Sequence, residues 1–102
     1  PNLEKIEVAK GNNKITMESS SFKECKNLKN LSIYSNDALI GSRAFEDCKK
    51  LETVIIKGAN VNIESKAFVG CKNLKTLSIP ENAEVAEDAF SGCDKVPDKY
   101  KK

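Results

Sequence analysis

The sequence predicts a right-handed α/β repeat solenoid of four turns, and three observations lead to this fold class. Four phenylalanines recur at intervals of 22 or 23 residues, and four cysteines follow at the same intervals, each in an F-x-x-C element. The members are Phe22, Phe45, Phe68 and Phe90, with Cys25, Cys48, Cys71 and Cys93. An apolar segment of one form also recurs in every repeat. Self-similarity at a fixed period of this size is typical of stacked repeats.

The recurring apolar segment has the form L-x-x-L-x-L and predicts a short strand. Its members are Leu3/Ile6/Val8, Leu28/Leu31/Ile33, Leu51/Val54/Ile56 and Leu74/Leu77/Ile79. Alternation with a period of two is typical of a strand with one buried face. A second apolar segment follows in each repeat, at Ile15/Met17, Ala38/Ile40, Val61/Ile63 and Ala83/Val85. We expect the first segments to form a short parallel sheet and the second to form an extended return.

A helical or 3-10 turn is expected just before each F-x-x-C element. Ser19, Ser42, Ser65 and Glu87 stand three residues before the phenylalanines. Serine is a good helix N-cap, and glutamate suits the positive end of a short helix. The first repeat is about two residues longer than the others, and its residues 10–13 (KGNN) predict a small protruding loop.

These repeats predict one domain over residues 1–96, with turns at about 3–27, 28–50, 51–73 and 74–96, followed by a Lys-rich tail over 97–102. Val96 occupies the next leucine position, but Pro97 ends the pattern. Solenoids usually need capping repeats, and neither end has a recognisable one. We therefore expect the chain to be a piece of a longer protein.

The motif A-F-x-x-C-x-x-L-x-x-L-x-I closely resembles the BspA-like (treponemal-type) leucine-rich repeat. Residues 44–51 (AFEDCKKL), 67–74 (AFVGCKNL) and 89–93 (AFSGC) match it, and Ile79-Pro80 carries the proline that often follows the strand in this family. The first repeat departs from the motif with Ser21 in place of alanine. The resemblance covers residues 1–96. It implies a curved solenoid with its parallel sheet on the concave side, in a cell-surface or secreted protein of bacteria or protists that adheres to host or partner proteins.

Composition excludes several classes of function. Up to Cys93 the chain carries thirteen Lys/Arg and thirteen Asp/Glu, so it lacks the basic face that a nucleic-acid binder needs. It has no histidine, nucleophile–base pair or Gly-rich phosphate loop, so we expect no catalytic residues, no cofactor and no enzymatic activity. No apolar run approaches the ~20 residues of a membrane helix, and residues 1–5 do not resemble a signal peptide.

The cysteine ladder is expected to be structural. Stacking places one thiol per turn in a line with a spacing of about 4.8 Å. Four points on a line cannot form the tetrahedron of a zinc site, so no metal is expected. Neighbouring cysteines fall within disulfide range, but parallel side chains have a poor torsion for that bond. Free buried thiols are therefore favoured over disulfides, and the phenylalanine ladder is assigned to the core.

The outward positions of the first strands form the candidate binding face. They make three columns: Lys5/Asn30/Thr53/Thr76, Glu7/Ser32/Ile55/Ser78 and Ala9/Tyr34/Lys57/Pro80. The candidate protein-binding residues are Tyr34, Ile55 and Lys57, with Asn30, Thr53 and Ser32 beside them. An exposed aromatic residue next to a branched one can anchor a protein partner. The alternative is that Ile55 is simply a good strand former and Tyr34 a good cross-strand neighbour.

The sequence is compatible with two functions. The chain is expected to be a non-enzymatic protein-binding or adhesion module, with a host extracellular protein as one possible partner, or else a structural spacer without a ligand of its own. Lys26, Lys49 and Lys72 form a basic row, for which a solvated flank is favoured over a binding site. The terminal strand around Leu3, Ile6 and Val8 has no partner on its outer side, so self-association through the N-terminal turn is also expected.

Overall fold

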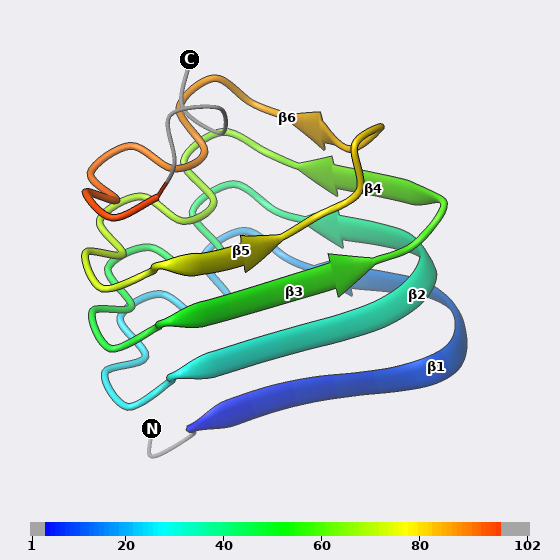
Figure 1. Cartoon of the computed structure of the whole chain (residues 1–102), viewed down its shortest axis with the longest axis horizontal. Helices are drawn as coiled ribbons and strands as arrows, with labels where there is room; N and C mark the ends of the chain where they lie inside the picture. The colour runs from blue at the N-terminus through cyan, green and yellow to red at the C-terminus, as the bar shows by residue number, and fades with distance from the viewer. Residues whose placement is uncertain (1–3, 97–102) are drawn as a thin grey trace.

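The computed structural model describes residues 4–96, which form a parallel-strand β-solenoid (Figure 1). Its strands are β1 (Lys5–Met17), β2 (Asn30–Ile40), β3 (Thr53–Lys57), β4 (Asn60–Ile63), β5 (Thr76–Ser78) and β6 (Glu84–Val85). Each strand pairs in parallel with its counterpart in the next repeat. The solenoid makes about three full turns from β1 to β5, rather than the expected four. Leu3 and the Lys-rich tail at 97–102 lie outside the described residues.

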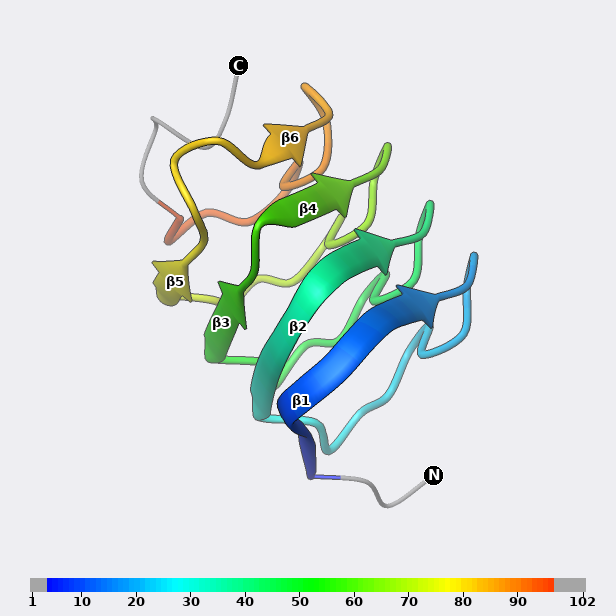
Figure 2. The same cartoon turned by 90° about the vertical axis from the view of Figure 1, so that its right-hand side faces the viewer.

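Each layer of the solenoid has two extended arms that run in opposite directions (Figure 1). Figure 2 views the layers from the side on which the arms are joined. We call residues 5–8, 30–34, 53–57 and 76–78 the first arm, and residues 14–17, 37–40, 60–63 and 84–85 the second arm. β2 runs through both arms and pairs with β3 along the first arm and with β4 along the second. The segment expected to be an extended return is therefore a second set of paired strands, and the sheet is broader than the sequence predicts.

The extra residues of the first repeat lie inside β1 as an irregularity. Val8 pairs with Ile33 and Asn12 with Ser35, so β1 uses four steps where β2 uses two. An insertion into one strand of a pair is accommodated as a local bulge. The expected protruding loop at residues 10–13 is thus part of a strand at the bend between the arms.

The bend of the third layer depends on a glycine. Gly58 follows β3, and a Cβ atom at this position would overlap the carbonyl oxygen of Ser35 in the layer below. Only a residue without a side chain allows this approach of two backbones. Ser35 is itself buried, and its Oγ donates a hydrogen bond to the Asp37 carbonyl at 2.9 Å.

The structure corrects the expected helical turns, since residues 4–96 contain no helix. The segments that carry the phenylalanines are successive tight turns instead. Left-handed backbone occurs at Ser20, Arg43 and Lys66 with φ of 60°, 58° and 60°, and again two residues after Phe22 and Phe45, at Glu24 and Asp47. A residue with positive φ interrupts a right-handed helix. The fold is therefore all-β with turns and not α/β.

Hydrogen bonds between layers explain why these turns form. The N–H groups of Phe22, Phe45 and Phe68 donate to the carbonyls of Ala44, Ala67 and Ala89 in the next layer, each at 2.8 Å. A helix would direct these N–H groups along its own axis and leave the neighbouring layer without its partners. The serines expected as N-caps also act between layers: Ser42 Oγ donates to the Ser65 carbonyl and Ser65 Oγ to the Asp88 carboxylate, both at 3.0 Å.

The phenylalanines form one continuous stack through the core. Successive ring centroids are 5.2 Å apart from Phe22 to Phe90, and the planes differ by 5° to 7°. Phe45, Phe68 and Phe90 are fully buried, whereas Phe22 is half-buried at the end of the stack. The inward residues of both arms pack against this stack, so the core lies between the arms and the turns.

Candidate functional site

The six candidate binding residues lie on one surface, the outward side of the first arm, which we call the first-arm outer face. Register joins Asn30 to Thr53 and Thr76, and joins Ser32 to Ile55 and Ser78. Tyr34 pairs directly with Lys57. Side chains alternate between the two sides of a strand, so these columns point away from the buried Leu31 and Ile33. The side chain of Ala9, expected in the Tyr34 column, lies outside the described residues.

Tyr34 is the distinctive residue of this face. It is 37% exposed, and no other large hydrophobic side chain is exposed among those that the structure describes, in residues 4–8 and 14–96. Ile55 is half-buried and stands diagonally across from Tyr34, while Lys57 is exposed. Diagonal neighbours in a sheet are within reach of an aromatic side chain. The structure therefore brings an aromatic ring, a branched apolar side chain and an ammonium group together on an otherwise small and polar surface.

The cysteines form a second repeated constellation, inside the molecule. All four are free and buried. The thiols of Cys48, Cys71 and Cys93 donate hydrogen bonds to the carbonyls of Phe22, Phe45 and Phe68 in the preceding layer, at 3.1, 3.1 and 3.0 Å. These thiols therefore tie one layer to the next.

The chemistry of the thiols suits a structural role. Hydrogen bonds with the Cys48 and Cys93 thiols, together with burial, raise the pKa of Cys71 above its ordinary value of 9.0. Burial also raises the pKa of Cys25, whereas the hydrogen bond with Cys71 lowers the pKa of Cys48. A protonated, buried thiol is a poor nucleophile and a poor metal ligand. Within the described residues, no group of three or more His, Cys, Asp or Glu side chains is arranged around a metal position.

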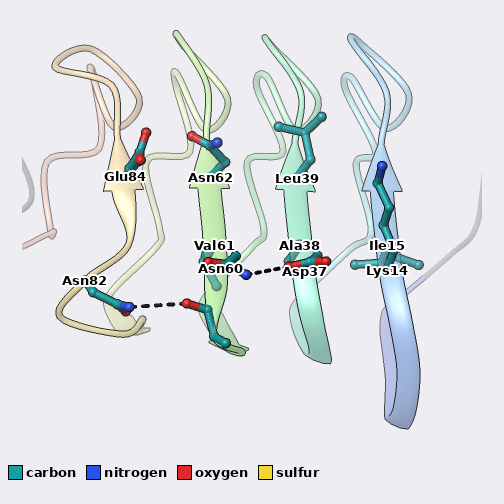
Figure 3. A pocket seen from close by; sticks show the side chains of 11 residues that line it. Lys14, Ile15, Asp37, Ala38, Leu39, Asn60, Val61, Asn62, Asn82 and Glu84 are labelled. Carbon is teal, nitrogen blue, oxygen red and sulfur yellow. Dashed lines mark hydrogen bonds between the residues drawn. The ribbon is translucent and has the colours of Figure 1, made fainter.

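The outward side of the second arm carries a groove that the sequence did not point to (Figure 3). It has a volume of about 300 Å³ and is lined by polar side chains that include Lys14, Asp37, Asn60 and Asn82. Asn60 Nδ2 donates to Asp37 Oδ1 at 2.7 Å, and Asn82 Nδ2 donates to the Ala59 carbonyl at 3.2 Å. These polar positions recur once per repeat, which is the signal that could have revealed them.

The lining of this groove offers hydrogen bonds rather than catalysis. Its side chains are amides, carboxylates, one lysine and small or aliphatic residues, without a nucleophile–base pair. The amide groups of Asn60 and Asn82 are already bonded to the neighbouring layer. The groove is therefore weaker as a candidate than the first-arm outer face, where the exposed Tyr34 has no comparable structural duty.

The repeats of this chain match a known protein family. A family model for the BspA type leucine-rich repeat region (6 copies) matches residues 1–98. The chain belongs to the BspA-type leucine-rich-repeat family. No curated protein and no solved structure matches the chain. BspA-type repeats generally serve as protein-interaction or structural modules and are typically not enzymatic.

Within this BspA-type array, the motif residues are internal. Ala44, Phe45 and Cys48 are fully buried, as are Ala67, Phe68 and Cys71. The motif therefore builds the scaffold, and any specificity of this chain belongs to the outward positions between motif residues. No helix in the described part is long and apolar enough to cross a membrane.

Proposed function

We propose that this BspA-type repeat array is a protein-binding module that engages its partner through the first-arm outer face. The observation that carries the proposal is the exposed Tyr34 beside Ile55 and Lys57. Protein interfaces concentrate their binding energy in a few residues, and tyrosine is enriched among them. A cell-surface or secreted setting is typical of the family, so an extracellular host protein is the proposed class of partner.

The surroundings of Tyr34 support this use. Asn30, Ser32 and Thr53 have short side chains, so a partner surface can approach the sheet closely and reach the ring. Their amide and hydroxyl groups supply the polar rim that typically surrounds an apolar anchor. Lys57, opposite Tyr34, adds a charge that favours a partner with an acidic residue at that point.

A structural spacer is the second candidate, and the hydrogen bonds between layers favour it. Main-chain bonds link the turn segments of every pair of neighbouring layers, and Ser65 and Asn60 add side-chain bonds. Such an array transmits rigidity along its axis without needing a ligand. In this role the exposed Tyr34 would be a strand-forming residue only.

Capture of extracellular host proteins on the immobilised chain separates the two functions. We expect Tyr34→Ala/Ile55→Ser to weaken binding of the captured protein at least tenfold, which corresponds to about 1.4 kcal/mol. A matched control, Leu39→Ser/Asn62→Ala on the second arm, should leave the affinity unchanged. Equal binding by the Tyr34→Ala/Ile55→Ser variant and the unmodified chain would contradict the proposed face. No capture by the unmodified chain would favour the spacer.

A further inference from the structure

Three loops that precede β2, β3 and β5 stack along one corner of the solenoid, at the left of Figure 1. They are residues 26–29 (KNLK), 49–52 (KKLE) and 72–75 (KNLK), and we call them the basic corner. Its lysines are Lys26, Lys29, Lys49, Lys50, Lys72 and Lys75, all of which are exposed. One carboxylate, Glu52, belongs to the same loops. The corner therefore adds Lys29, Lys50 and Lys75 to the simple row of Lys26, Lys49 and Lys72.

The fold holds these lysines in a regular array. In each loop a leucine N–H donates to the carbonyl of the preceding cysteine, as from Leu51 to Cys48 at 3.1 Å, so the loop closes tightly over the core. The Glu52 and Lys75 N–H groups donate to the Lys29 and Glu52 carbonyls, at 2.8 and 3.0 Å. Successive loops are therefore in register, and the layers repeat at about the 5.2 Å spacing of the phenylalanine rings.

Neighbouring carboxylates only partly balance the strip. Lys75 Nζ lies 4.0 Å from Glu52 Oε1, and both side chains are about half exposed or more, so this ion pair is weak. Glu24 and Asp47 line a hollow of about 420 Å³ together with Lys26, Lys49 and Lys50. Glu4 and Asp94 occupy the equivalent positions of the first and last layers, and Lys95 lies against Asn73 of the third loop. With all of these included, seven lysines face five acids, and the three loops themselves carry six lysines and one acid. The acidic residues Glu81, Glu84, Glu87 and Asp88 instead gather around β6, in the last layer of the second arm.

We propose that the basic corner binds a sulfated polysaccharide that runs along the solenoid axis. A polyanion in this direction meets at least one ammonium group in each of the three loops, and lysine pairs with sulfate as a point charge without a fixed geometry. The corner shares no residue with the first-arm outer face but adjoins it, because Lys29 and Glu52 directly precede Asn30 and Thr53. Binding there would give a surface protein a second, charge-based attachment.

Other polyanions fit the corner less well. Proteins that bind single-stranded nucleic acid generally stack bases on aromatic side chains, and the three loops contain none. Their apolar residues, Leu28, Leu51 and Leu74, are fully buried, so the loops offer nothing to insert into a lipid surface.

Binding of fluorescent dextran sulfate tests the proposal, with uncharged dextran of the same length as the reference. We expect saturable binding of dextran sulfate that weakens about tenfold or more between 50 and 200 mM salt, and no binding of dextran. Lys49→Glu/Lys72→Glu should weaken binding at least tenfold. Lys14→Glu/Lys57→Glu has the same net charge but changes lysines outside the corner, and it should weaken binding by about twofold at most.

Four outcomes would overturn the proposal. They are equal losses in the two charge-matched variants, binding of uncharged dextran, tighter binding of single-stranded DNA than of dextran sulfate, and absence of binding. A salt-dependent dimer abolished by Lys49→Glu/Lys72→Glu, without dextran sulfate binding, would assign the corner to the acidic β6 region of a second copy. Circular dichroism confirms folding of each variant, and Lys49→Gln/Lys72→Gln replaces the glutamate pair if that pair fails to fold.

Discussion

Phe45 and Phe68 differ from the other two phenylalanines at the level of the single residue, because each ring stacks on both of its faces. Phe22 occupies the same position of the F-x-x-C element but has one stacking neighbour among the described residues, and it is half-buried. Tyr34 shows the opposite case, an aromatic ring placed by strand alternation on the outward side and left exposed. The same residue class thus serves as core or as candidate anchor according to its position in the repeat.

Truncation of the stack tests the energetic weight of these rings. Phe45→Ala and Phe68→Ala should each lower the free energy of unfolding by about 3–5 kcal/mol, because a buried aromatic residue leaves a cavity that its neighbours cannot fill. A domain of this size holds only ~5–15 kcal/mol in total. Phe22→Ala should cost less. Chemical denaturation measures all three, and equal losses at Phe22 and Phe45 would contradict the account of burial by stacking.

The turn segments are the elements that set this solenoid apart from the expected α/β fold. Each is bonded to the next layer through main-chain groups and through a cysteine thiol, as in Cys71 to the Phe45 carbonyl. The protonated state of the Cys71 thiol is therefore part of the element's stability. The stability of the chain should accordingly depend on alkaline pH.

The Cys71 thiol provides the pH test. Its pKa is raised in the folded chain, so above pH 9.0 the unfolded chain loses this proton while the folded chain keeps it. The unfolded state then binds fewer protons, and the free energy of unfolding should fall by up to about 1.4 kcal/mol per pH unit from this thiol, with its full contribution present below pH 9. Denaturation of the unmodified chain and of Cys71→Ala between pH 8 and pH 11 should show a shallower decline in the variant. Parallel declines would contradict the prediction.

At the scale of the whole molecule, β1 is a strand that pairs with β2 alone among the described residues. Ile6 and Val8 of this strand are half-buried and cover the end of the core. Unpaired strand edges are sites where chains associate. We therefore propose that the isolated chain self-associates through β1.

Sedimentation at increasing concentration tests this association. The unmodified chain should form dimers or larger species, and Ile6→Lys should shift it toward monomer because a charge at the open core layer opposes stacking of a second copy. Glu7→Lys adds charge on the outward side of the same strand and is the matched control. Thermal denaturation verifies that both variants fold. A chain that stays monomeric at high concentration would rule out the association.

The interval between repeats was enough to determine the layers, the parallel first-arm strands and their register. The pairs Tyr34–Lys57 and Ser32–Ile55 follow directly from the spacing of 23 residues. Spacing also placed Phe45 beside Phe68 and the cysteines in one buried column, because stacking of identical units brings equivalent positions together. The membership of the candidate binding face could therefore be predicted from sequence.

Only the tertiary structure decided the backbone conformation of the turns and bends that join the strands. Ser20, Arg43 and Lys66 have side chains compatible with a helix, and their positive φ reflects hydrogen bonds to a neighbouring layer that no local pattern encodes. The pairing of β4 with β2 likewise follows the bend at Gly58, where two backbones approach each other. Exposure of Tyr34 and the joining of six lysines into one corner depend on how the layers stack. Local sequence sets which residues recur, and contacts between layers set which backbone conformation each of them adopts.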